Sequence, residues 1–233
     1  MAIDHSNLIA QCNNIVISND DDKAAWFLGN KGFFVKSFYK ENKCSQIPVP
    51  SNFLWKTRLP HKAKVFLWLV LHNKILTKDN LSKRNWKWNL NCVFCGLPES
   101  IDHLFFQCSV ARFIWRIIQT ALNLNSIPSD VENLFGPWMN SFSITEKNLV
   151  LFGCGAVIWA IWRSRNNCCF NVTLIDDPTN VIFSCCFWID AWTIRQKEKE
   201  KKLVEQGNLR IRKTTSEIFR QAHGWKPVDR RIQ

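Results

Sequence analysis

The sequence predicts a mainly α-helical protein with one β-hairpin near its N-terminus and one structural zinc site. Three observations support this prediction. Apolar residues recur at helical spacing after residue 60, cysteines and a histidine stand at metal-ligand spacing between residues 92 and 108, and a Gly-Asn-Lys-Gly turn separates two short aromatic runs. Hydrophobic residues make up 46% of the 233-residue chain, which is enough for a core and argues against global disorder.

The expected elements follow in chain order. The aromatic runs and their turn predict the hairpin at 26–35. A helix is expected to begin at Pro60, with a body over 65–71 that is apolar nearly all round and therefore buried. Thr77 is expected to cap a short helix, and Thr145 a long one. The expected later segments are helices at 77–84, 109–123, 145–167 and 178–206, with a connector at 124–144.

Cys92, Cys95, His103 and Cys108 are spaced as C-x2-C-x7-H-x4-C. Three thiolates and one imidazole form a closed tetrahedral set for Zn²⁺ and leave no open position for water or substrate, so we expect a structural rather than a catalytic zinc. The alternative is coincidence, because the chain has ten cysteines and buried free cysteine is common. A histidine and a third cysteine at finger-like spacing favour zinc.

The second half of this motif carries a geometric constraint. His103 and Cys108 are five residues apart, which is about 140° around an ideal α-helix, so they cannot share one ion on an unbroken helix. We therefore expect His103 on a short helical turn opened by Ser100, and Cys108 just before a second helix capped by Ser109. Gly96 follows the second cysteine and allows the first half to turn tightly.

Charge favours a polyanionic partner. The chain has 31 Lys and Arg against 19 Asp and Glu, a net charge of +12, although a basic surface can also serve solubility alone. The N-terminus shows no secretory signal, so the cysteines are expected to be reduced and the protein to reside in the nucleus or cytoplasm, not to be secreted. The longest apolar run, 149–162, is too short to span a membrane and is interpreted as a buried core helix.

The segment 56–88 holds nine Lys or Arg and a single acid, Asp79. Basic residues interleaved with Trp55, Trp86 and Trp88 favour binding to RNA or DNA, with phosphate contacts and base stacking. The alternative is that the tryptophans are core and the lysines only solvate it. The candidate nucleic-acid contacts are Lys56, Arg58, Lys62, Lys64, Lys83, Arg84 and Lys87. Arg165 is interpreted as an exposed arginine at a helix C-terminus, with phosphate binding as the alternative.

No Gly-rich phosphate loop and no nucleophile–base pair stands in the sequence, so we expect no enzyme activity and no small-molecule substrate. Three consecutive aspartates at 20–22 are interpreted as a solvated turn rather than a Mg²⁺ site. The adjacent cysteine pairs at 168–169 and 185–186 lack neighbouring histidines and are expected to be core thiols.

A further set of residues follows in fixed order over about 22–118. It comprises Trp26, GFFVKSFY at 32–39, Trp55-Lys56, PHKAKVFLW at 60–68, Leu76-Thr77, Asn80-Leu81, the four candidate ligands with Glu99-Ser100 and LFF at 104–106, and Trp115. This combination resembles the zinc-binding domain that follows the polymerase domain in plant LINE-type (non-LTR) retrotransposon reverse transcriptases. The resemblance implies Zn²⁺ as the cofactor and the same four ligands.

The resemblance does not extend to a polymerase domain, because no catalytic aspartate pair after an aromatic residue is visible. We expect no RNase H domain either, because Trp225-Lys226-Pro227 resembles the linker that leads into that domain. We expect a reverse-transcriptase-type zinc-binding domain at 22–123, a helical continuation at 145–206 and a basic C-terminal tail at 207–233. The expected function is a non-catalytic zinc-binding module that binds RNA or DNA. The alternative is an interaction scaffold that docks on a polymerase or another protein.

Overall fold

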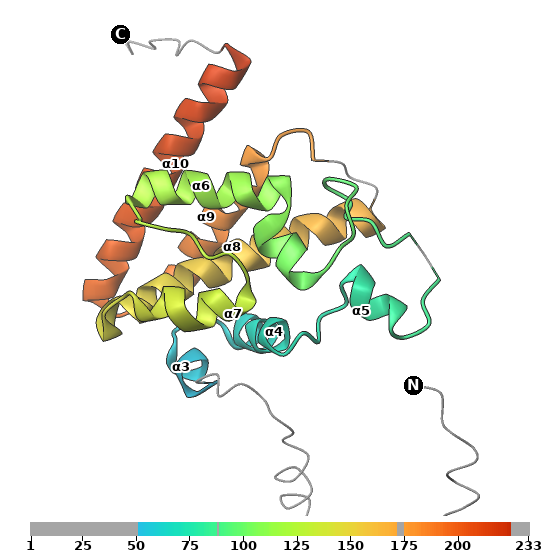
Figure 1. The fold of residues 1–233 in the computed structure, drawn as a ribbon. Helices are drawn as coiled ribbons and strands as arrows, with labels where there is room; N and C mark the ends of the chain where they lie inside the picture. Colours follow the sequence, from blue (N-terminus) through green and yellow to red (C-terminus); the bar gives the residue numbers. More distant parts are fainter. Residues whose placement is uncertain (1–50, 88, 172–174, 225–233) are drawn as a thin grey trace, which may run out of the picture. The chain divides into compact units, whose positions relative to one another are not determined.

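The computed structural model describes residues 51–87, 89–171 and 175–224 (Figure 1). Within these ranges the chain forms helices and loops, with one isolated antiparallel bridge between Asn91 and Pro98. The mainly helical class is confirmed, whereas the hairpin expected at 26–35 lies outside the described residues. The elements are α3 (Ser51–Lys56), α4 (His61–Leu71), α5 (Lys78–Ser82), the π-helix η1 (His103–Gln107), α6 (Ser109–Leu122), α7 (Val131–Asn133), the π-helix η2 (Leu134–Trp138), α8 (Ile144–Phe170), α9 (Thr179–Thr193) and α10 (Glu198–His223).

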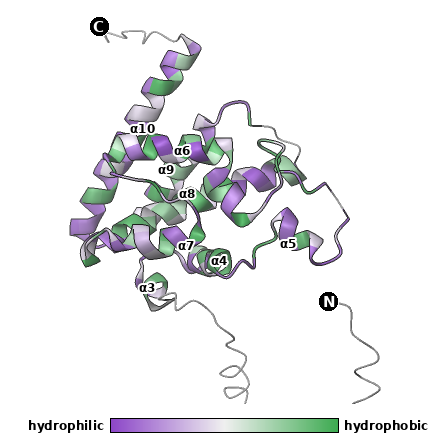
Figure 2. Cartoon of the chain, in the orientation of Figure 1, coloured by the Kyte–Doolittle hydropathy of each residue, from purple (hydrophilic) through white to green (hydrophobic). Residues whose placement is uncertain are grey.

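The long helix α8 is the centre of the core. Helices α4 and α9 and the π-helix η1 pack against it, and residues 154–161 are buried without a break. In Figure 2 the hydrophobic colour gathers on α4 and α8. By length and composition alone α8 could cross a membrane, but 56% of its most apolar window is buried inside the protein. This helix therefore has the burial of a core helix, as the apolar run 149–162 predicts.

A glycine allows α4 to approach α8 closely. A Cβ added at Gly155 would lie 3.1 Å from side-chain carbons of both Leu59 and Leu67, so no larger residue fits without movement. Beside this contact, the ring of Phe66 lies 5.2 Å from Trp159 in an edge-to-face arrangement. Leu67 is fully buried, and Phe66 is 7% exposed. The apolar run that follows Pro60 thus packs against α8 and forms part of the core.

The prediction that this run is buried all round is wrong, because one face of α4 meets solvent. Val65 and Trp68 are each 36% exposed, and Trp55 of α3 is 40% exposed. Helices α3, α7 and α8 pack against α4 and Phe105 of η1 contacts Phe66, while Val65 and Trp68 lie on the exposed face. A run in which every residue is apolar shows no periodicity that could separate a buried face from an exposed one.

Two of the cap predictions can be compared with the helix starts. Thr77 directly precedes α5, as expected, although the helix ends at Ser82 rather than near residue 84. The long helix α8 is capped by Ser143 and not by Thr145. The Ser143 hydroxyl accepts the Glu146 N–H, and the Glu146 carboxylate accepts the Ser143 N–H at 2.9 Å, which forms a capping box.

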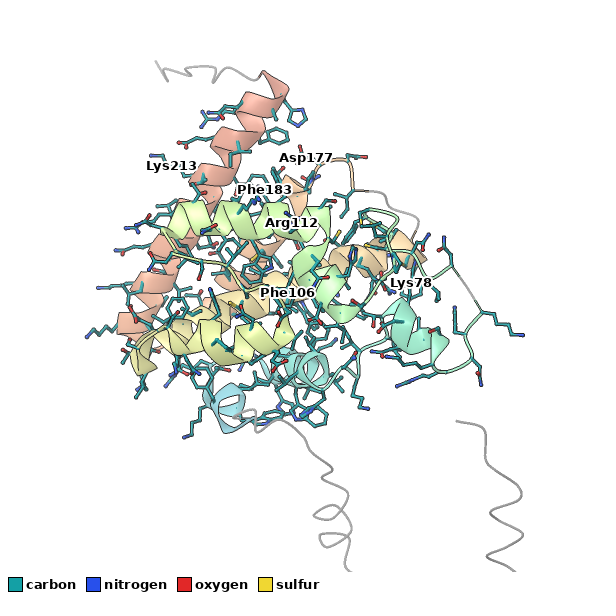
Figure 3. The ribbon with its side chains drawn as sticks, viewed as in Figure 1. Lys78, Phe106, Arg112, Asp177, Phe183 and Lys213 are labelled. Carbon is teal, nitrogen blue, oxygen red and sulfur yellow. The ribbon has the colours of Figure 1, made fainter. Side chains whose placement is uncertain are left out.

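The segments at 124–144 and 178–206 differ from the predictions. The expected connector contains α7 and η2, and Trp138 and Leu134 are buried there. The expected helix at 178–206 is two helices, because the chain turns at 194–197 and α10 packs back on α9 and α6. No glycine or proline marks this turn, so packing and not local sequence sets it. Residues 207–223, expected as a tail, continue α10, on which Lys213 extends into solvent (Figure 3).

Candidate metal centre

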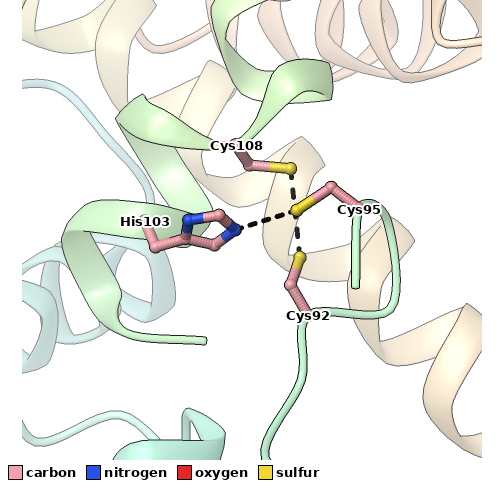
Figure 4. Close-up of side chains that lie close together, drawn as sticks. All are labelled: Cys92, Cys95, His103 and Cys108. Atoms are coloured by element: carbon pink, nitrogen blue, oxygen red, sulfur yellow. Dashed lines mark hydrogen bonds between the residues drawn. The ribbon is translucent and has the colours of Figure 1, made fainter. Parts of the chain in front are cut away.

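The four candidate ligands come together at one point (Figure 4). The sulfurs of Cys92 and Cys108 are 3.9 Å apart, and the sulfur of Cys95 is 3.1 Å from Nε2 of His103. All four ligand atoms lie within 4.8 Å of one another. A tetrahedral ion with Zn–S bonds of about 2.3 Å needs sulfurs about 3.8 Å apart, so the observed arrangement fits zinc. It is the one such cluster within the described ranges.

The first two ligands lie on a tight turn. Gly96 has φ +76°, a left-handed conformation that favours glycine, and its N–H donates to the carbonyl of Cys92 at 2.9 Å. The Cys92 N–H in turn donates to the carbonyl of Leu97 at 2.6 Å. The bridge between Asn91 and Pro98 closes the loop below these bonds. The glycine after the second cysteine therefore has the role that the sequence predicts.

The other two ligands are brought together by a π-helical turn. The chain is helical from Ile101, and the Ser100 hydroxyl accepts the His103 N–H at 3.1 Å, so Ser100 opens the turn as expected. The Cys108 N–H then donates to the carbonyl of His103 at 2.7 Å, five residues back. This wider i+5 turn places Cys108 near His103, where an α-helix would separate them by about 140°. The predicted cap Ser109 is wrong by one residue, because Cys108 occupies the N-cap position of α6.

Burial and contacts between the ligands shift the pKa values of Cys92, His103 and Cys108. The hydrogen bond to Cys108 and burial raise the pKa of Cys92, while the same hydrogen bond lowers the pKa of Cys108. Burial lowers the pKa of His103, which favours the neutral imidazole that binds metals. Three thiolates this close together would repel one another, so holding all three deprotonated requires a cation. The chemistry of the donor set points to a divalent metal that prefers sulfur and nitrogen.

A buried ion pair that no sequence pattern predicted lies behind the metal loop. Glu99 and Arg165 are each 2% exposed, and the guanidinium donates to both carboxylate oxygens, at 2.7 and 3.3 Å. Glu99 also accepts the Lys78 N–H at 2.9 Å, and the Arg165 guanidinium lies 5.1 Å from the ring centre of Trp162. The expectation of an exposed or phosphate-binding Arg165 is therefore wrong. Its spacing of four residues from Ile161 is the signal that places it on the buried face of α8.

The candidate nucleic-acid contacts fall into two sequence groups around α3–α4 and α5. Lys64 is half-buried and the other six are exposed. Four of the seven have protein partners: Arg58 donates to the Arg195 carbonyl, Lys64 donates to the Trp55 carbonyl, Lys83 contacts Asp79, and the Lys62 ammonium lies 6.0 Å from the ring centre of Trp159. Trp86 is 49% exposed, while Trp88 lies outside the described residues. Nothing in this arrangement tests binding, so the role of these residues stays a prediction.

Residues 33–115 match the family described as zinc-binding in reverse transcriptase. The match includes all four residues of the cluster and ends at Trp115 in α6. Over these residues the chain is similar to the zinc-binding domain of reverse transcriptases. The resemblance noted in the sequence is thereby confirmed over these residues.

A curated relative supports the same assignment. It is an Arabidopsis thaliana protein named "Putative ribonuclease H protein", and it is 30% identical to this chain over 107 residues. The matched region is 43% of this chain but 17% of the relative, so this chain spans only a small part of that protein's length. No solved structure matches this chain.

Proposed function

We propose that this chain is a non-catalytic module of retrotransposon reverse-transcriptase origin that holds one structural Zn²⁺ and binds RNA or DNA through a basic surface. The observation that supports zinc is the closed set of Cys92, Cys95, His103 and Cys108, whose ligand atoms lie within 4.8 Å of one another. When bound, the ion would fix the loop at 91–98 to the π-helical turn that precedes α6.

Metal analysis of the purified, reduced protein tests the zinc assignment. We expect about one zinc per chain, and we expect the Cys92→Ser and Cys108→Ser variants to lose it and to melt earlier, because structural zinc contributes folding free energy. Cys154→Ser is the matched control, since Cys154 is also a buried thiol but lies outside the cluster. Stoichiometric zinc in the Cys92→Ser/Cys108→Ser double variant would refute the assignment.

The charge distribution supports a nucleic-acid partner. Residues 51–78 contain no acid, and they carry Lys and Arg on and around α3 and α4. Lys56 and Lys62 on these helices, and Arg84 and Lys87 after α5, are exposed and form no ion pair within the described part of the chain. Unpaired surface cations of this kind bind phosphates with little sequence preference, with dissociation constants on the order of 10⁻⁶ M at best.

Gel shifts with RNA and DNA across a salt series test this proposal. We expect a variant with four substitutions to Glu to lose binding and to keep the fold, because the original side chains make no ion pair in the described part of the protein. The four replaced residues are Lys56, Lys62, Arg84 and Lys87. The matched control places Glu at Lys199, Lys202, Arg210 and Lys213, four exposed cations of α10, which gives the same change in net charge. Equal loss of binding in both variants would mean that only net charge matters, and no shift at low salt would refute the proposal.

The exposed face of α4 favours a second candidate, docking on a polymerase or another protein. Trp55, Val65 and Trp68 are more than a third exposed, which is unusual for large apolar side chains packed on a core helix. The salt series separates the two candidates, because phosphate contacts weaken steeply as salt rises and an apolar interface does not. Replacement of Trp68 by Ala would weaken a protein complex and leave a phosphate-driven gel shift unchanged.

The non-catalytic part of the proposal rests on the ligand set, because four protein ligands leave no open position on the metal. The aspartates at 20–22 lie outside the described residues. We expect no Mg²⁺-dependent primer extension, and extension that Asp21→Asn abolishes would contradict this. We place the protein in the nucleus or cytoplasm, in keeping with eight free cysteines among the described residues.

A further inference from the structure

The two halves of the metal centre meet at Glu99. The metal loop at 91–98 carries the first two ligands, and the helical segment that begins at Ile101 leads to the other two. Only residues 99 and 100 connect these two parts. The angle between the parts decides whether the four ligand atoms can surround one ion, so the position of this connection matters for the metal.

The backbone of Glu99 holds the connection on both sides. Its N–H donates to the Leu90 carbonyl at 3.0 Å, just before the metal loop, and its carbonyl accepts the Asp79 N–H of α5 at 3.3 Å. The hydroxyl of the next residue, Ser100, accepts the His103 N–H at 3.1 Å. A displacement of Glu99 would therefore move the metal loop and the turn that carries His103 relative to each other.

The side chain of Glu99 anchors this connection to α8. Its buried carboxylate accepts two hydrogen bonds from the Arg165 guanidinium, at 2.7 and 3.3 Å, and a third from the Lys78 N–H at 2.9 Å. The guanidinium also donates to the Asn166 side chain at 3.0 Å and lies against the ring of Trp162. These neighbours fix the orientation of the guanidinium, and the guanidinium in turn fixes the carboxylate.

Stability alone does not account for this ion pair. Buried ion pairs lose so much hydration that apolar side chains of similar volume are often equally stable or more stable in their place. What the pair provides, and apolar side chains would not, is direction, because two hydrogen bonds hold the carboxylate at one angle to the guanidinium. Helix α8 supplies none of the four ligands, but through this pair it determines where Glu99 lies.

We propose that Glu99 and Arg165 are positioning residues of the metal centre, through which α8 sets the angle between the metal loop and the His103 turn and thereby the affinity for zinc. This inference rests on the zinc site proposed above. It adds a contribution from a helix that lies beyond the family match at 33–115. Replacement of residues that orient metal ligands typically lowers metal affinity by about 10–100-fold.

Two measurements on the full-length protein test this proposal: competition for Zn²⁺ with a chromogenic chelator, and the visible absorption of the Co²⁺-loaded protein, which reports ligand geometry. We expect Glu99→Gln and Arg165→Met each to weaken zinc binding by about tenfold or more and to change the Co²⁺ spectrum. Arg165→Lys keeps the charge but not the paired hydrogen bonds, so its effect should lie between wild type and Arg165→Met. Gly155→Val is the matched control, because it disturbs α8 at Leu59 and Leu67 and not at the metal centre, and it should leave the spectrum and the zinc affinity unchanged.

Wild-type spectra and zinc affinities in both Glu99→Gln and Arg165→Met would overturn the proposal. Equal weakening by Gly155→Val would also overturn it, because the pair would then act only through the stability of α8. If Arg165→Met does not fold, Glu99→Gln and Arg165→Lys decide the question, since both new side chains are similar in size and still form hydrogen bonds. A wild-type protein that binds neither Zn²⁺ nor Co²⁺ would overturn the zinc site and this inference together, whereas the first two results overturn the inference alone.

Discussion

Removal of the buried arginine is the most informative perturbation of the fold. Arg165→Met keeps the length of the side chain but leaves the Glu99 carboxylate, 2% exposed, without its cation. Three hydrogen bonds from the guanidinium, two to Glu99 and one to Asn166, and a guanidinium–indole contact are lost, while the Lys78 N–H still bonds to the carboxylate. Breaking one partner of such a pair costs about 3–5 kcal/mol. We expect about 3 kcal/mol, because the remaining N–H partly stabilises the carboxylate.

Urea and thermal unfolding measure this cost. A loss of about 3 kcal/mol lowers the melting temperature by roughly 6–12 °C in a chain of this size. Glu99→Gln should cost a similar amount, and the Glu99→Gln/Arg165→Met double variant should cost less than the sum of the single variants by at least about 1.5 kcal/mol. Arg84→Met, at an exposed arginine without an ion pair, should stay within about 0.5 kcal/mol of wild type. A loss below about 1 kcal/mol for Arg165→Met, or strict additivity, would refute the reasoning.

Further predictions concern α8 and the metal. Gly155→Val should destabilise the protein by about 1–3 kcal/mol, because the new side chain meets Leu59 and Leu67. Gly153→Ala should instead stabilise it by up to about 1 kcal/mol. Equal effects of the two variants in denaturant unfolding would contradict the close packing of α4 on α8. Ser143→Ala should lower the free energy of unfolding by about 1 kcal/mol and Thr145→Ala by less than about 0.5 kcal/mol, since Ser143 is the N-cap of α8. The reverse order would indicate that Thr145 is the cap. Hydrogen bonds from Ser143 lower the pKa of Glu146, so the contribution of this carboxylate is present above the usual glutamate pKa and is lost as the pH falls through the lowered value. An NMR titration of the Glu146 carboxyl should show a higher pKa in Ser143→Ala, and an unchanged pKa would count against the capping box. Metal release measured with a zinc-sensitive dye should increase as the pH falls, because protons compete with the ion for three thiolates and His103.

Local patterns were sufficient for much of the fold. The amphipathic repeat at 109–123 predicted α6, and its apolar positions Ile114, Ile117 and Ile118 are buried. The limits of the helices were harder to predict. Ser143 and Thr145 both have side chains suited to a cap, and only the position of Glu146 three residues after Ser143 separates them. The turn between α9 and α10 has no local signal, because contacts such as the one from Asn208 to Cys186 stabilise it.

The candidate metal site could be predicted as a set of residues but not in all its geometry. Spacing alone identified Cys92, Cys95, His103 and Cys108, because ligands close in sequence have few ways to surround one ion. The constraint between His103 and Cys108 was also visible, but a π-helical turn is too rare to expect from a sequence. The pair of Glu99 and Arg165 joins residues 66 positions apart, and a single sequence contains no direct signal for such a contact.

The packing of α4 against α8 determines how this protein can be dissected. The segment that matches the family ends at Trp115, yet Phe66 of that segment is covered by Trp159 and Trp162, and Leu67 faces Gly155. A recombinant fragment cut after residue 115 would expose these side chains to water and invite aggregation. Recombinant fragments intended for metal analysis or crystallisation should therefore extend at least through the end of α8 at Phe170. In this protein the unit of folding is longer than the unit that sequence families define.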